Sequence, residues 1–161
     1  PLWAYSGDYL TELAAPFVGQ ERLRWSYAIK TLEDAGAKIA FGSDWSVTSA
    51  NPFHQIETSI TRQSATNVTA LENKPVDPEQ DVPLFIEESI SLEAAIKAFT
   101  LNAAFVNKIE SITGSLEVGK LADLVILDQN LFEIEPYDIS ETQALITFFE
   151  GQVVHGDLAQ L

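Results

Sequence analysis

The chain has 161 residues, the size of one ordinary domain, and is too short for a complete (β/α)8 barrel of about 250 residues. Its 9 Lys and Arg against 24 Asp and Glu give a net charge of −15, which argues against nucleic-acid and anionic-membrane partners. The absence of cysteine excludes disulfides and thiolate chemistry, and the only two histidines, His54 and His155, cannot form a site of three imidazoles.

The first part of the chain predicts a loop followed by one helix. Proline and glycine interrupt residues 1–20, which leaves room for only a short helical piece. From Glu21 onward an apolar residue recurs every three or four positions, which predicts one amphipathic helix ending at Ala35. Gly36 follows at the position where a helix end favours a left-handed residue.

The next part predicts a short strand, a loop and a second helix. The run from Ile39 to Phe41 is apolar without alternation, which is typical of a strand buried on both faces of a parallel sheet. Asn51 and Pro52 provide an N-cap and a first-turn proline for a helix that extends to about Gln63. Helix, strand, loop and helix together form the repeating half of an α/β unit.

Residues 64–83 are rich in proline and acids and predict a surface loop. Ser91 then predicts the cap of a helix whose apolar face extends to Phe99. The acids between Asp77 and Glu88 raise the alternative of a calcium-binding module, but they lack the alternating spacing and central glycine of a calcium loop. We therefore interpret them as a solvated face.

The character of the chain changes to β near residue 113. Ser115–Val118 and Asp123–Asp128 predict two strands around a turn, and the second contains a buried run of Leu, Val and Ile. Leu145–Phe149 and Gln152–His155 flank Glu150-Gly151, which predicts a hairpin with a two-residue turn. We therefore place an α/β part before this boundary and a small β part after it.

Asp44 is the sharpest candidate for chemistry, because it follows the predicted buried strand. The carboxyl ends of strands in barrels and open α/β sheets are where ligands bind. A carboxylate there, next to Trp45, can hold a divalent metal or accept a proton. The alternative is that Asp44 is a structural residue of the turn, where aspartate is common. His54 could face the same edge, although an exposed helix histidine near Glu57 is the simpler interpretation.

Two further features bear on partners and completeness. No apolar run approaches the roughly 18 residues of a membrane helix, and the first residues do not read as a signal peptide. The chain begins with proline and contains no methionine, so we expect a fragment or a processed product.

Several strings in this order resemble the amidohydrolase superfamily, and its family 3, YtcJ-like branch most. FGSDW at 41–45, followed by NPF and ending with ITR at 60–62, resembles the last barrel strand and helix. SLEAAIKAFTLNAA at 91–104 resembles the helical segment after the barrel. GSLEVGKLADLVILD at 114–128 and FFEGQVVHGD at 148–157 are similar to strands of that superfamily's small β-sandwich.

The resemblance implies an α/β fold: residues 1–113 as the C-terminal portion of a (β/α)8 barrel and 114–161 as part of a composite β-sandwich. It also implies a metal-dependent hydrolase, often with zinc, that cleaves C–N bonds in amides, ureas or cyclic amides of a small molecule. Asp44 matches the family aspartate that contacts the metal and takes a proton from water. Trp45 and His54 are then candidate substrate contacts.

The family's His-x-His pair and its other metal-binding histidines and middle-strand ligand have no match in this chain. We therefore expect a C-terminal portion, inactive alone, whose exposed barrel edges promote homo-oligomer formation. The alternative is a non-catalytic scaffold or oligomerisation module of the same fold, in which Asp44 is a structural turn residue.

Overall fold

The computed structural model describes residues 4–5, 7, 9–65 and 82–160. In the described residues up to Val106 the regular elements are all helical, and a small antiparallel sheet follows. The α-helices are α1 (Ala15–Val18), α2 (Gln20–Leu23), α3 (Ile29–Asp34), α4 (Pro52–Thr61), α5 (Leu92–Phe99) and α6 (Leu101–Val106). The strands are β1 (Leu124–Leu127), β2 (Ala144–Phe149) and β3 (Gln152–His155). A π-helical turn η1 (Tyr9–Ala14) and the 3₁₀ turns η2 (Ile86–Glu88), η3 (Pro136–Glu141) and η4 (Leu158–Gln160) complete the elements.

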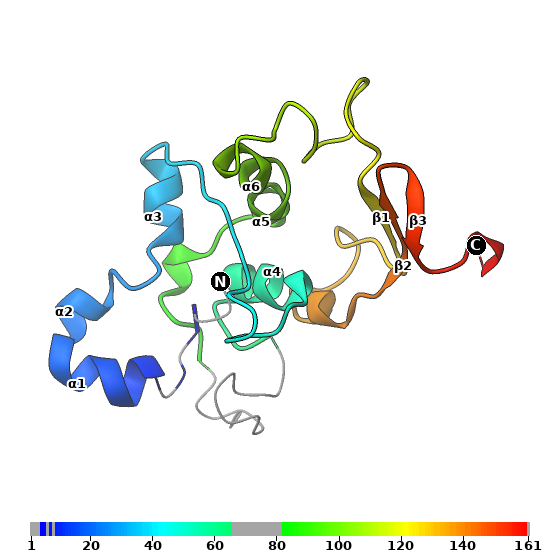
Figure 1. The fold of residues 1–161 in the computed structure, drawn as a ribbon. Coiled ribbons are helices and arrows are strands. Elements are labelled where there is room, and N and C mark those ends of the chain that lie inside the picture. The colour runs from blue at the N-terminus through cyan, green and yellow to red at the C-terminus, as the bar shows by residue number, and fades with distance from the viewer. Residues whose placement is uncertain (1–3, 6, 8, 66–81, 161) are drawn as a thin grey trace.

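The elements are arranged along an extended molecule. The helices α1–α3 lie at one end, the sheet lies at the other, and α4–α6 lie between them (Figure 1). Within the described ranges, no helix is long and apolar enough to cross a membrane. The middle of the molecule is therefore where the helical part and the β part meet, and η3 packs there on α4.

The prediction of one helix from Glu21 to Ala35 is wrong, because the chain breaks into α2 and α3 with a turn between them. Tyr27 in that turn has a left-handed backbone, with φ of 56°. The apolar stripe that predicted the helix is only partly covered: Ile29 is buried, but Trp25 and Leu32 are more than half exposed. A stripe without a packing partner does not hold a long helix together, since most helical stability in proteins comes from tertiary packing.

The predicted end of α3 and the starts of α4 and α5 are confirmed. Gly36 has φ of 87°, and its N–H bonds to the Glu33 carbonyl at 2.8 Å, as in a left-handed helix cap. The Asn51 side chain accepts a hydrogen bond from the Phe53 N–H at 3.0 Å. Ser91 does the same for the Ala94 N–H at 3.1 Å. These caps are local signals, so they hold irrespective of tertiary context.

The predicted strand from Ile39 to Phe41 is not a strand in the part of the chain that the structure describes. The Phe41 N–H instead donates to the Ala98 carbonyl at the end of α5, at 3.0 Å. A cavity of about 510 Å³ lies beside residues 37–42. A strand needs neighbouring strands to complete its hydrogen bonds, and no described strand lies next to this segment.

The β part is partly as predicted. Ser115–Val118 is irregular, with a turn that begins only at Val118, and Leu116 and Val118 are strongly exposed, so the prediction of that strand is wrong. The strand β1 and the β2–β3 hairpin are confirmed, in the sheet order β1-β2-β3 with both pairs antiparallel. Glu150 and Gly151 both have positive φ, of 50° and 79°, which is the geometry of a type I′ hairpin turn.

The main hydrophobic core joins residues from both halves of the sequence. Ile29, Ile56 and Ile90 pack with Leu131 and Ile139, which come after residue 113. The helix α4 lies in the middle of this core and is buried nearly all round. It also carries or precedes many of the buried polar side chains, namely Gln55, Glu57, Thr58, Ser59, Thr61 and Arg62.

Candidate functional site

Asp44 stands at the tip of the loop between the extended segment and α4. Its backbone is left-handed, with φ of 56°, and its side chain is exposed. Its carbonyl accepts a hydrogen bond from the Val47 N–H at 2.7 Å, which closes a tight turn. Among the described residues, the structure gives the Asp44 carboxylate no hydrogen-bond or ion-pair partner. The carboxylate is therefore available to a ligand or to a reacting group.

The other two predicted site residues lie in different surroundings. Trp45 is 73% exposed and follows Asp44 in the same turn. His54 is half-buried in the first turn of α4, and burial lowers its pKa while the charge of Glu141 raises it. No interaction between His54 and Asp44 is present in the described part of the chain. Trp45 therefore lies in the same turn as Asp44, whereas His54 lies outside it.

The described residues do not by themselves fit a metal ion. They contain no group of three or more His, Asp or Glu side chains placed to hold one. A tight zinc site in a protein uses three or four side-chain ligands, and Asp44 can supply only one. Of the acids considered for calcium, Glu88 instead accepts hydrogen bonds from the Thr31 N–H and hydroxyl, and residues 77–81 lie outside the described residues.

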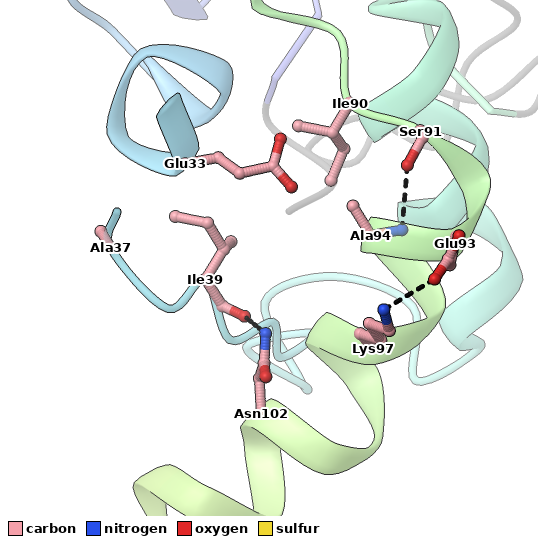
Figure 2. A pocket seen from close by; sticks show the side chains of 9 residues that line it. All are labelled: Glu33, Ala37, Ile39, Ile90, Ser91, Glu93, Ala94, Lys97 and Asn102. Atoms are coloured by element: carbon pink, nitrogen blue, oxygen red, sulfur yellow. Dashed lines mark hydrogen bonds and ion pairs between the residues drawn. The ribbon is translucent and has the colours of Figure 1, made fainter. Parts of the chain in front are cut away.

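Three cavities formed by the described residues are not lined by Asp44. One of about 200 Å³ opens between α3 and α5, where Glu33 points toward Ile39 and Ile90 (Figure 2). Its lysine, Lys97, is paired with Glu93 at 2.7 Å. A larger cavity of about 610 Å³ lies between α5, α6 and β1 and is mainly apolar. Among the cavities that the described residues form, neither these two nor the one beside residues 37–42 is lined by Asp44 or by its predicted companions.

Glu57 is a buried carboxylate that the sequence analysis considered only as a neighbour of His54. It is 3% exposed at the contact between α4 and η3, and its Oε2 accepts a hydrogen bond from the Ser140 N–H at 2.7 Å. Burial raises the pKa of Glu57 to about 7, the Ser140 hydrogen bond opposes this, and the charges of Glu141 and Asp138 add to it. The contact between the two parts of the chain therefore contains a group that titrates near neutral pH.

This titration predicts a pH-dependent stability. The folded protein holds a proton on Glu57 that the unfolded chain releases above its ordinary pKa of 4.5. The contribution of Glu57 to the free energy of unfolding therefore falls as the pH rises from about 4.5 to 7. Glu57→Gln retains an acceptor for Ser140 but does not titrate. We expect its free energy of unfolding, relative to that of wild type, to rise by about 2–3 kcal/mol as the pH rises from 4 to 8.

The measurement is urea unfolding of the two purified proteins across that pH range. His54 acts in the opposite direction, because its pKa is lowered on folding, but it is present in both proteins and cancels in their difference. Glu133→Gln, at an exposed carboxylate, is the matched control and should follow wild type. Parallel pH curves for Glu57→Gln and wild type would contradict the role of Glu57.

Arg62 is the second buried ionic group that sequence reasoning did not single out as a buried charge. It is 0% exposed, its Nε donates to the Leu84 carbonyl at 2.8 Å, and its Nη1 donates to the Tyr27 carbonyl at 3.2 Å. Burial lowers its pKa to about 10, while the nearby Glu88 and Glu87 raise it. Arg62 is therefore charged at neutral pH and joins three segments of the helical part.

One sequence signal could have found both groups. The side of α4 opposite its apolar residues carries small hydroxyl side chains, such as Thr58 and Ser59, rather than lysines and glutamates. Small polar residues fit a helix covered on every side, whereas a solvent face usually carries long charged side chains. A charged residue in such a helix is then expected to be buried with partners.

The chain matches the model of the amidohydrolase family over residues 4–155. It is 33% identical over 139 residues to Protein LONG AFTER FAR-RED 3 of Arabidopsis thaliana, covering 86% of this chain and 21% of that protein. It is 25% identical to the N-substituted formamide deformylase of Arthrobacter pascens, covering 82% of this chain and 22% of the enzyme. It is 27% identical to YtcJ of Bacillus subtilis (strain 168), covering 86% of this chain and 24% of that protein. The chain thus spans about a fifth to a quarter of the length of these relatives.

Proposed function

Since the chain belongs to the amidohydrolase family, we propose that it is the C-terminal portion of a hydrolase that cleaves a carbon–nitrogen bond, other than a peptide bond, in a small molecule. The family match over residues 4–155 carries this proposal. The deformylase, which by its name acts on N-substituted formamides, gives one class of substrate to test. In the whole protein, residues 1–113 would complete a (β/α)8 barrel and residues 114–161 would complete a β-sandwich.

Asp44 is the residue to which we assign the proton transfer. It follows an apolar segment, its side chain is exposed, and its own carbonyl closes the turn with the Val47 N–H. A carboxylate in this position can accept a proton from an attacking water and return it to the leaving nitrogen. Trp45, exposed beside it, is the proposed substrate contact, and His54 is a second one at the start of α4.

A divalent metal ion, most simply zinc, belongs to the proposal only for the whole protein. Among the described residues, Asp44 is the carboxylate that we propose as a ligand, and no group of three His, Asp or Glu side chains is placed to hold a metal ion. In the proposal Asp44 is one ligand among others supplied from outside this chain.

The many exposed apolar side chains, among them Phe17 and Val118, support our proposal that the protein forms a homo-oligomer.

The test is an assay of the whole protein with N-substituted formamides and with cyclic amides, together with elemental mass spectrometry of the purified sample. We expect release of an amine or a ring-opened acid, with a bound divalent metal. A protein that carries no metal and turns over neither class would contradict the hydrolase and support the scaffold alternative.

A further inference from the structure

We infer that two side-chain amides, those of Gln55 and Asn102, are positioning residues that fix the backbone on either side of Asp44. The inference rests on the proposed function, because it concerns the carboxylate to which that function assigns proton transfer. Neither amide is given a part in the chemistry. Their place is to hold the loop that presents the carboxylate.

The first attachment of the Asp44 loop lies before Asp44 in the sequence. The Asn102 Nδ2 donates a hydrogen bond to the Ile39 carbonyl at 2.8 Å, across a sequence separation of 63 residues (Figure 2). Two residues further on, the Phe41 N–H donates to the Ala98 carbonyl at 3.0 Å. The Phe41 ring meets the Phe99 ring edge-on, with centroids 5.5 Å apart. The segment that leads to Asp44 is therefore attached to the junction of α5 and α6 rather than to a strand.

The second attachment of the loop lies after Asp44 in the sequence. Gln55 is 0% exposed, and its Nε2 donates to two loop carbonyls, that of Ser49 at 2.9 Å and that of Asn51 at 3.3 Å. Its Oε1 is buried and has no hydrogen-bond partner. All the hydrogen bonding of this buried amide is thus directed at the end of the Asp44 loop. A buried side-chain amide with two bonds to one loop is a specific attachment, because its own N–H groups are out of reach of water and need these acceptors.

Between the two attachments, hydrogen bonds within the loop itself hold its turns together. The buried Thr48 hydroxyl donates to the Ser43 carbonyl, and the Val47 N–H donates to the Asp44 carbonyl at 2.7 Å. The helices that hold the two ends, α4 and α5, pack against each other. The loop that carries Asp44 is therefore attached at both ends to one packed unit.

The rate of a catalysed reaction depends steeply on the position of the catalytic group, since a displacement of that group by about 1 Å can reduce the rate about a hundredfold. We expect Gln55→Met, which retains the volume of the side chain, to lower kcat about 10- to 100-fold in the whole protein, with KM changed by less than about twofold. We expect Asn102→Ala to do the same. The substrate assayed is the N-substituted formamide or cyclic amide that the wild type turns over.

The chain offers matched controls. Gln129 makes the same number of hydrogen bonds as Gln55, because its Nε2 donates to the Thr142 hydroxyl at 2.9 Å and to the Asp138 carbonyl at 3.3 Å, but it is half-buried and lies in the β part. Asn107 donates to the Ala103 carbonyl at 2.9 Å within its own helix end. Gln129→Met and Asn107→Ala remove the same number of bonds away from Asp44, so we expect both to leave kcat unchanged.

A second readout is independent of activity. Trp45 is next to Asp44, and in protein labelled with 5-fluorotryptophan its ¹⁹F resonance is identified by its loss in Trp45→Phe. We expect this resonance to shift or broaden in Gln55→Met and in Asn102→Ala, and to stay in place in both controls. A structural role elsewhere in the fold would not move this resonance selectively.

The outcomes separate the two proposals. If Asp44→Asn is inactive while the two amide variants retain wild-type kcat and the wild-type resonance, the positioning role is overturned and the proposed function stands. If the whole wild-type protein turns over neither substrate class, the proposed function fails, whereas a fully active Asp44→Asn protein removes only the assignment of proton transfer to Asp44. In both cases the resonance alone decides whether the amides hold the loop. Should circular dichroism show that Gln55→Met does not fold, Asn102→Ala decides, because Asn102 is only half-buried.

Discussion

Replacing Asp44 with asparagine is expected to lower turnover by the whole protein about 10²- to 10⁴-fold, the range by which positioned acid–base groups accelerate reactions. Asparagine has the shape of aspartate and also tolerates the left-handed backbone that Asp44 adopts, with φ of 56°. It can neither accept a proton nor carry a charge. The turn closed by Val47 remains intact, so the loss is expected in kcat at unchanged stability.

The measurement is steady-state release of amine or acid by wild type and variant, with thermal unfolding followed alongside. Asp157→Asn is the matched control, because Asp157 is an exposed aspartate whose Oδ1 accepts a hydrogen bond from the Ala159 N–H at 2.9 Å in a terminal turn. It should retain full turnover. An Asp44→Asn protein with wild-type kcat would remove Asp44 from the chemistry and favour the structural turn interpretation.

Replacing Arg62 with leucine is expected to destabilise the protein by about 3–5 kcal/mol. The side chain is fully buried, and its loss would leave the carbonyls of Leu84 and Tyr27 without their donors. It would also remove the positive charge that helps to lower the pKa of Glu88, against the opposing effect of that residue's own burial. Leaving buried polar groups unpaired is among the largest costs that one substitution can cause.

Urea unfolding followed by circular dichroism measures this effect. Arg24→Leu is the control, because the exposed Arg24 guanidinium lies over the Trp25 ring, 5.2 Å from its centroid. Its replacement should change the free energy of unfolding by about 1 kcal/mol or less. Arg62→Lys retains the charge but not the forked geometry, and is expected to lie between the two. A loss below about 1 kcal/mol for Arg62→Leu would show that the guanidinium is not a structural link.

The predictions from sequence that are confirmed rest on local signals. Asn51 and Ser91 mark helix starts, and Gly36 and Gly151 occupy left-handed positions, because caps and tight turns depend on a few neighbouring residues. The strand at Ile39–Phe41 fails for the opposite reason: an apolar run becomes a strand only beside another strand.

The candidate site divides in the same way. The position of Asp44 at the end of an apolar segment could be predicted, because chain order alone determines it. The small polar residues of α4 indicate that Glu57 and Arg62 are buried, but their partners could not be predicted, since these lie in η3 or in segments far along the chain. Gln55 likewise reads as an ordinary polar helix residue, and only its contacts with Ser49 and Asn51 reveal where its amide points.

The spacing of polar contacts along α4 has a consequence for how this protein can vary in length. Gln55 holds the Asp44 loop, Glu57 meets η3, and Arg62 joins the helix end to Leu84. One inserted or deleted residue between these positions rotates the rest of the helix by about 100°, which would turn at least one of the three groups away from its partner. Insertions and deletions should therefore be excluded from α4.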